Sequence, residues 1–498
     1  MNRLKVFSAL LLLGIWPVLS QANSFSSKKF IVKYKSKKHA LRMNQDPRKF
    51  MYQNSIAKTM SSDTESSLVQ DDIEYVEEDI IVRHSAIPGD LGGTRDYYYY
   101  NQWALGSSSY GINAVDAWDI TTGRSDIVVA VIDTGIVAHQ DINDQLVQGH
   151  DFISDPAFAV DGDGRDNDPT DVGDWVQSGD SCYQGSFERS SWHGSHVAGI
   201  IAAKTANRIG IAGTAWHSKI LPIRVLGKCG GYTSDIADAI RWAAGGEVSG
   251  VPSNQNPAKV INLSLGGQGS CGQYLQSAID YARSRGSVIV VAAGNESLDL
   301  DSSDVAPANC NGVIRVASSN RSGSLSSFSN YGQRIDISAP GEGIYSLSNT
   351  GSTTSESESY VSYSGTSMAA PYVSGVVALM MSENDTLYPN QYKSIIKESA
   401  NTDITCGSKG CGSGIIDAYQ AILMAQNEVA DSSVEDETNV QREPLSGESK
   451  IMQTSSSSGF CGSVAFSKDD DPKGALGLLL LVGLIATVIG RLRVKRSL

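Results

Sequence analysis

The chain lacks several features that would place it in a simple class. Its 49 glycines and 14 prolines in 498 residues show no Gly-X-Y period, which excludes a collagen-like chain. It has no C-x-x-C pair, which argues against a cysteine-ligated zinc site. Positive charge is also scarce: 40 basic and 54 acidic residues give a formal net charge of -14, so we expect no nucleic-acid partner. At about 100–200 residues per domain, the length allows two to four domains.

The two ends of the chain predict export and contact with a membrane. Residues 1–22 have the pattern of a secretory signal peptide: Arg3 and Lys5, then an apolar run, then Ser20 and Ala22 at a cleavage site. The alternative is a buried N-terminal helix. Residues 474–490 are apolar and precede a basic cluster, so they predict a transmembrane segment. We therefore expect a secreted or surface-attached protein.

Composition and hydrophobic pattern divide the remainder into four parts. Residues 23–90 contain strand-like segments at 28–35 and 73–82 and predict a small α/β domain. Residues 91–426 form one large domain, residues 427–460 an acidic and Ser-rich linker, and residues 461–498 a C-terminal tail.

Strands and helices alternate within the large domain. Buried strands are expected at 127–132, 259–265, 287–293, 312–318 and 334–338. Helices are expected between and after them, at 193–204, 234–245, 271–286 and 367–384. This alternation predicts an α/β fold with a mostly parallel twisted sheet and helices on both faces.

Six of the seven cysteines lie in the large domain, and disulfides are the expected state in an exported protein. Proximity favours three pairs, although six cysteines allow 15 connectivities: Cys406–Cys411, Cys271–Cys310 and Cys182–Cys229. Cys461 is alone in the tail.

Four polar residues stand where secondary-structure elements begin or end. Asp133 ends the strand at 127–132, and Asn295 follows the strand at 287–293. His193 opens one helix and Ser367 opens another. Ligands bind at the carboxyl edge of open α/β sheets, and helix N-termini favour negative charge. These residues could supply an orienting carboxylate, a general base, a nucleophile and an oxyanion donor for amide hydrolysis.

The segments around these residues resemble the signature segments of subtilisin-like serine proteases. They are VIDTGI, HGSHVAGII, INLSLGG, VVAAGNE and SGTSMAAPYVSGVVAL, in a resemblance that spans about residues 102–424. It implies a serine endopeptidase in which Asp133 orients His193, His193 is the general base and Ser367 is the nucleophile. It further implies Asn295 as the oxyanion donor and Ser264, Leu265 and Gly266 as the substrate-binding edge. His196, in the same motif as His193, is interpreted as a packing residue.

A long insertion between Asp133 and His193 contains DGDGRDNDPTD, whose alternating carboxylates suit a hard cation with oxygen ligands. A solvated Asp/Gly turn is the alternative. Subtilases commonly bind structural calcium, and Asp141 resembles one of the family's ligand positions. Asp151 and Asp168 resemble acidic ligands in the kexin-like branch. The resemblance therefore implies a calcium cofactor.

The flanking segments also resemble parts of exported proteases. Residues 23–90 resemble the family's inhibitory propeptide, with a maturation cut expected between residues 83 and 97. The tail resembles bacterial C-terminal sorting signals removed by a sorting protease, and a permanent anchor is the alternative. We expect protein and peptide substrates and broad specificity. A dedicated processing protease of surface proteins and an inactive surface binding module are the other two hypotheses.

Overall fold

The computed structural model describes residues 29–34, 55–59, 73–78, 96–107, 110–180, 183 and 185–431. The chain divides into two compact units, Met1–His84 and Ser85–Leu498. The expected signal peptide, the linker and tail beyond residue 431, the segment 474–490, Cys182 and Cys461 lie outside the described residues. Within the described part, no helix combines the length and the hydropathy needed to cross a membrane.

The first unit contains an antiparallel sheet of three strands in the order β2-β1-β3. Its strands are β1 (Lys29–Tyr34), β2 (Ser55–Thr59) and β3 (Ile73–Glu78). The sequence pattern predicted β1 and β3 but not the short, polar β2.

The second unit is built on a parallel sheet of seven strands in the order β12-β11-β9-β7-β4-β6-β5. These strands are β12 (Ile337–Pro340), β11 (Ile314–Ser319), β9 (Val288–Ala292), β7 (Val260–Leu263), β4 (Val128–Asp133), β6 (Lys219–Arg224) and β5 (His150–Asp151). Two strand pairs lie outside this sheet: β8 (Gly267–Gln268) with β10 (Val305–Ala306), and β13 (Ile344–Asn349) with β14 (Glu358–Tyr363).

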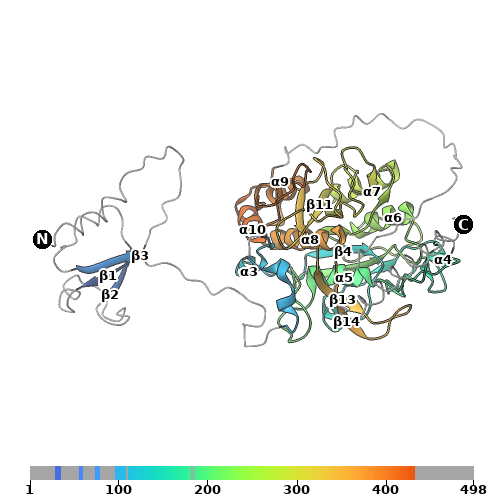
Figure 1. Ribbon diagram of the computed structural model, residues 1–498, viewed down its shortest axis with the longest axis horizontal. Coiled ribbons are helices and arrows are strands. Elements are labelled where there is room, and N and C mark those ends of the chain that lie inside the picture. The colour runs from blue at the N-terminus through green and yellow to red at the C-terminus, as the bar shows by residue number, and fades with distance from the viewer. Residues whose placement is uncertain are drawn as a thin grey trace, which may run out of the picture. The chain divides into compact units, whose positions relative to one another are not determined.

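Helices cover both faces of this sheet, as the alternation predicted. The α-helices are α3 (Ala114–Ala117), α4 (Pro156–Ala159), α5 (His193–Ala202), α6 (Thr233–Ala243), α7 (Gln273–Ser284), α8 (Thr366–Glu383), α9 (Pro389–Glu398) and α10 (Ala418–Asn427). Short 3-10 helices are η4 (Tyr99–Asn101), η5 (Trp103–Leu105) and η6 (Asn143–Gln145). Within this unit, Figure 1 shows α9 and α10 at one side and α6 and α7 at the other.

Alternate side chains of each strand belong to two separate cores. In β4, Val129 and Val131 pack in one core with α5 and α8, whereas Ala130 and Ile132 pack in the other with α6 and α7. This alternation follows from the two-residue period of a strand. Because both faces are buried, the strands read in the sequence as continuous apolar runs.

The sequence analysis missed β6, which contains Pro222. Proline cannot donate to a sheet ladder and usually indicates an edge strand or no strand. In the structure Pro222 is aligned with Val131 of β4, and the short β5 pairs only with Ile223 and Arg224. Pro222 thus lies inside the strand, with Gly149 so close that an added Cβ there would lie 1.9 Å from the Pro222 carbonyl oxygen.

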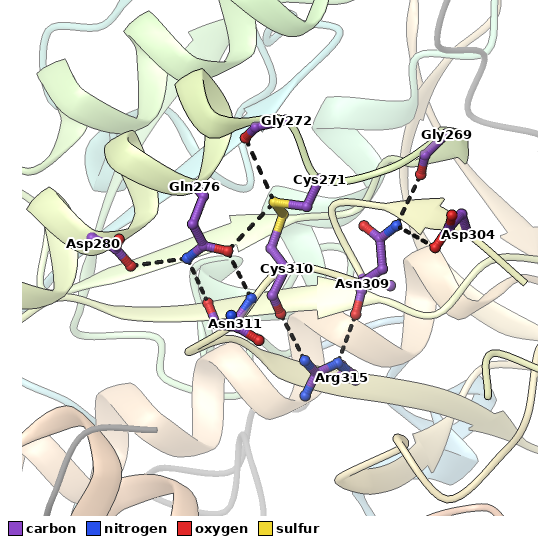
Figure 2. Close-up of a disulfide and its surroundings, with 11 residues drawn as sticks. Gly269, Cys271, Gly272, Gln276, Asp280, Asp304, Asn309, Cys310, Asn311 and Arg315 are labelled. Carbon is purple, nitrogen blue, oxygen red and sulfur yellow. Dashed lines mark hydrogen bonds between the residues drawn. A yellow bond between two sulfur atoms is a disulfide. The ribbon is translucent and has the colours of Figure 1, made fainter. Parts of the chain in front are cut away.

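Two of the three expected disulfides are described. Cys271–Cys310 links the segment before α7 to the turn before β11, and Cys406–Cys411 closes a short loop. Figure 2 shows the first of these beside Gln276 and Arg315. The buried Arg315 guanidinium donates from Nη2 to the Cys310 carbonyl at 2.7 Å and so fixes that turn. Cys229 is also disulfide-bonded, and its expected partner lies outside the described residues.

Candidate active site

Asp133 is the last residue of β4, at the carboxyl edge of the sheet, and its side chain is fully buried. Its Oδ1 atom accepts a hydrogen bond from the Thr134 backbone N–H at 2.7 Å. The same oxygen lies 2.7 Å from His193 Nδ1. One carboxylate oxygen therefore holds the imidazole, and the Thr134 N–H fixes the orientation of that oxygen.

His193 is the first residue of α5, where Gly194 allows the helix to approach the loop after β4. A Cβ atom on Gly194 would lie 2.2 Å from the Gly135 carbonyl oxygen, so only glycine fits. The imidazole donates from Nδ1 to Asp133, which leaves Nε2 as the basic nitrogen. Within the described part of the chain, this buried Nε2 has no hydrogen-bond partner.

The pKa of His193 is set by opposing effects. Burial lowers the pKa, but the charge of Asp133 and its hydrogen bond raise it, and the charges of Asp174 and Asp171 raise it further. The net effect is a pKa above the usual value for histidine. The site thus favours the imidazolium that a general base becomes when it takes a proton.

Ser367 is the second residue of α8, and its contacts depend on a proline four residues later. Pro371 has no N–H to donate to the Ser367 carbonyl, as a residue at this helical position normally would. That carbonyl instead accepts a hydrogen bond from Ser264 Oγ at 2.8 Å. Ser367 Oγ in turn donates to the Ser264 carbonyl at 3.1 Å. Ser367 and His193 lie in the first turns of α8 and α5, two helices that pack against each other.

Asn295 follows β9, and its amide orientation is fixed by Thr366. Its Oδ1 atom accepts hydrogen bonds from the Thr366 backbone N–H at 2.8 Å and from Thr366 Oγ1 at 3.0 Å. A Cβ atom on Gly365 would lie 3.5 Å from Asn295 Nδ2. The Asn295 amide is thereby held beside the first turn of α8, whose second residue is Ser367, and an oxyanion donor must be fixed near the nucleophile in this way. The sequence analysis did not identify Thr366 as the residue that orients Asn295.

The expected substrate-binding edge follows β7. Ser264 is buried and tied to Ser367, as described above. Leu265 packs its side chain into the core beside α6 and α7, and Gly266 is half-buried. Asn262 Nδ2 donates to Ser264 Oγ at 2.9 Å and thereby links this edge to the sheet.

His196 has the surroundings expected of a packing residue. It is buried, its ring stacks on Tyr363 with centroids 4.6 Å apart, and its Nε2 contacts the Val361 carbonyl at 3.2 Å. Burial, and then the charge of His193, lowers the pKa of His196 to about 3. A histidine that stays neutral in this way does not act as the general base.

The three expected metal ligands do not come together. Asp151 forms a buried ion pair with Arg224, with Oδ2 2.5 Å from Nη1, so its charge is already neutralised. Asp168 is exposed and accepts hydrogen bonds from the N–H and hydroxyl of Thr170. Asp141 is buried. Among the described residues, no group of three or more His, Cys, Asp or Glu side chains is placed to hold a metal ion.

Asp151 and Asp168 thus do not fit a metal site, and Asp141 lies in different surroundings. Asp141 accepts hydrogen bonds from Asn207 Nδ2 at 2.7 Å, from the Ile211 N–H at 2.9 Å and from the Tyr360 hydroxyl at 3.3 Å. Burial is the main reason why its pKa rises to about 6, and the charge of Asp96 adds to this. Two buried carboxylates near each other are an environment that a cation would stabilise.

Comparison with known proteins agrees with this geometry. The family model described as "Subtilase family" matches residues 124–434. This chain belongs to the subtilase family. The chain is 50% identical over 356 residues to an extracellular protease of Xanthomonas campestris pv. campestris, covering 71% of this chain and 60% of that protein. It is 44% identical over 359 residues to an extracellular basic protease of Dichelobacter nodosus, covering 70% of this chain and 58% of that protein.

The match extends to solved structures. A protease of Pseudoalteromonas arctica PAMC 21717 aligns with a TM-score of 0.65 and 46% identity, covering 68% of this subtilase and all of that chain. The fold class predicted from the sequence is thereby confirmed. The chain spans about three-fifths of the length of the two curated relatives described above.

Proposed function

We propose that this subtilase is a secreted serine endopeptidase that hydrolyses peptide bonds through an acyl-enzyme. The hydrogen bond of 2.7 Å between His193 Nδ1 and the buried Asp133 carboxylate is the observation that carries the proposal. It fixes the tautomer in which Nε2 is the base, as in the general Asp-His-Ser arrangement. The extracellular proteases to which the chain is similar support secretion.

Each residue then has a defined part in the reaction. Ser367 Oγ attacks the substrate carbonyl carbon while its proton passes to His193 Nε2, and Asp133 stabilises the resulting imidazolium. The developing oxyanion is bound by Asn295 Nδ2 and by the Ser367 backbone N–H at the start of α8. His193 then gives the proton to the leaving amine. Water, activated by the same nitrogen, releases the acyl group.

The test is the mass of the purified mature protein before and after treatment with a fluorophosphonate. We expect one adduct, mapped to Ser367 and absent from Ser367→Ala. A matured protein that takes no adduct would favour the inactive binding module. Mapping of the cuts in denatured casein then separates the two protease hypotheses, because scattered cuts indicate broad specificity and a narrow motif indicates a processing enzyme.

Calcium is proposed as a structural cofactor bound at Asp141. Its support is the burial of the Asp141 and Asp96 carboxylates against one loop: Asp96 accepts hydrogen bonds from three consecutive N–H groups of residues 206–208. A bound cation would offset the charge of both carboxylates and hold this loop. It takes no part in the chemistry. Removal of calcium with EGTA should lower the Tm, and Asp141→Asn should abolish that effect.

The first unit is proposed to be an inhibitory propeptide. Its support is a compact fold of its own, with strands β1, β2 and β3 in one sheet. The expected maturation cut between residues 83 and 97 follows this unit. Sequencing of the mature N-terminus tests it, and a first residue before 83 would contradict it. The membrane tail and its sorting protease stay proposals, tested by the mass of the mature C-terminus.

A further inference from the structure

Two acidic side chains of the insertion, Asp171 and Asp174, are bound directly to the residues that flank the catalytic pair. Asp171 is buried, and its Oδ2 accepts a hydrogen bond from the Thr134 hydroxyl at 2.6 Å. Thr134 follows Asp133 in the chain, and its Oγ1 accepts the Gly194 backbone N–H at 3.0 Å. The Thr134 hydroxyl therefore connects Asp171 both to the end of β4 and to the first turn of α5.

Asp174 holds the other side of His193. Its Oδ1 accepts the Ser191 backbone N–H at 2.6 Å, and its Oδ2 accepts the Ser191 hydroxyl at 2.7 Å. Ser191 precedes His193 by two residues, and its carbonyl accepts a hydrogen bond from the Tyr363 hydroxyl at 2.7 Å. Both the N–H and the C=O of Ser191, just before α5, are thus hydrogen-bonded to side chains.

Gly173 lies between the two acids and determines the backbone conformation of the segment that carries them. Gly173 has a φ of +107°, and a Cβ atom there would lie 1.9 Å from the Thr353 carbonyl oxygen and 2.5 Å from Ser190 Oγ. Only glycine fits this conformation and this close approach. Its N–H donates to Asp171 Oδ1 at 2.9 Å. The segment 171–174 is therefore a rigid brace and not a solvated loop.

The charges of the brace act on the imidazole. Asp174 and Asp171 follow Asp133 among the carboxylates that favour the charged form of His193. Burial, and then the charge of Asp174, raises the pKa of Asp171. The other titratable or charged groups whose charges act on this cluster are His196, Tyr363, Arg189 and Arg224.

We propose that Asp171 and Asp174 are positioning residues that hold the Asp133–His193 pair and stabilise its charged form during the reaction. This inference rests on the proposed protease activity. The two carboxylates act through Thr134, through Ser191 and through the electric field at the imidazole. Catalysis then depends on three carboxylates and not on Asp133 alone.

The test is the pH profile of kcat/KM for Asp174→Asn and Asp171→Asn. His193 accepts a proton only when it is neutral, so activity is lost as the pH falls through its pKa. Loss of a nearby negative charge lowers that pKa. We therefore expect the acid limb of the profile to move to lower pH by about half a unit in either variant, with a lower kcat.

A matched control exists in the same domain. Asp235 is buried like Asp171 and, like Asp174, accepts both the N–H and the hydroxyl of one serine, Ser154, at 3.0 Å each; it also forms an ion pair with Arg165. Its charge is not among those that act on His193. Asp235→Asn should lower the Tm as the other variants do, but leave the acid limb in place. Ser191→Ala keeps every charge and should lower kcat without moving the limb.

The outcomes are decisive. An acid limb that moves in Asp174→Asn or Asp171→Asn but not in Asp235→Asn supports the proposal. A limb that stays in place in both variants overturns it. If neither variant folds, as judged by circular dichroism, while Asp235→Asn does, the acids are structural and the proposal fails as well. Failure of the protease function itself is distinguishable, because the wild-type protein would then take no fluorophosphonate adduct.

Discussion

Replacement of Asp133 by asparagine separates the charge of this residue from its shape. Asp133 Oδ1 accepts the Thr134 N–H and contacts His193 Nδ1, both at 2.7 Å. An asparagine would keep its carbonyl oxygen at this position, because the opposite orientation would put its NH2 group against the Thr134 N–H. The tautomer of His193 with a proton on Nδ1 is therefore retained, and only the negative charge is lost.

The cost of that loss can be worked from the contact distance. An N···O distance of 2.7 Å places the centres of the imidazolium and carboxylate charges about 4 Å apart. At an effective dielectric constant of about 20, their attraction is about 4 kcal/mol. This attraction exists only when His193 is charged, so it lowers the barrier to acyl transfer. At about 1.4 kcal/mol per factor of ten, Asp133→Asn should reduce kcat by about a thousandfold.

The assay is the kcat of active-site-titrated enzyme on a peptide anilide, with KM measured in parallel. We expect KM to change little, because Asp133 is buried behind the imidazole. Asp126→Asn, at an exposed acid paired with Arg124, is the control and should retain full activity. A loss of less than tenfold in Asp133→Asn would refute the electrostatic argument. A loss of about ten-thousandfold or more would mean that the amide had turned and reversed the tautomer.

Further predictions concern the nucleophile, the oxyanion donor, one disulfide and one buried acid. Ser367→Ala should abolish turnover of a peptide anilide, whereas Asn295→Leu should lower kcat by a hundredfold or so, with little change in KM, since the donor acts on the transition state. Loss of the Cys271–Cys310 bridge, which closes a loop with a sequence separation of 39, should cost about 4 kcal/mol of unfolding free energy, measured by guanidinium denaturation of inactivated enzyme. The pKa of Asp141 is raised from 3.8 to about 6, so without calcium about 3 kcal/mol of stability should be lost as the pH rises from about 4 to about 6. An equal Tm at both pH values in EGTA would contradict this.

The candidate catalytic residues could be found from the sequence because each one marks the boundary of an element with a clear pattern. Asp133 ends one apolar strand and Asn295 follows another, and His193 and Ser367 lie in the first turns of apolar helices. Parallel strands bring their carboxyl ends to one edge, so positions far apart in the chain meet there. The strand β6 was missed because Pro222 obscured its pattern, although its apolar residues are as buried as those of β4.

The contacts that orient these residues could not be predicted in the same way. Thr366 was read only as part of a motif, and its two hydrogen bonds to Asn295 Oδ1 depend on how α8 meets the end of β9. The bond between Ser264 and the Ser367 carbonyl depends on Pro371, which removes a helical donor. Each contact joins segments that lie more than 70 residues apart, and no local pattern records it.

The acidic insertion shows most clearly why residue type alone does not assign a role. Asp168 and Asp171 belong to one run of carboxylates that suited a cation, and Asp151 precedes that run, yet each of the three has a different partner. Asp151 neutralises Arg224, Asp168 binds the exposed Thr170, and Asp171 binds Thr134 beside the catalytic pair. A carboxylate takes its function from the donor that faces it, and that donor comes from another element. The alternation of acids predicted a cation site, whereas the fold places the charges of Asp171 and Asp174 where they act on His193.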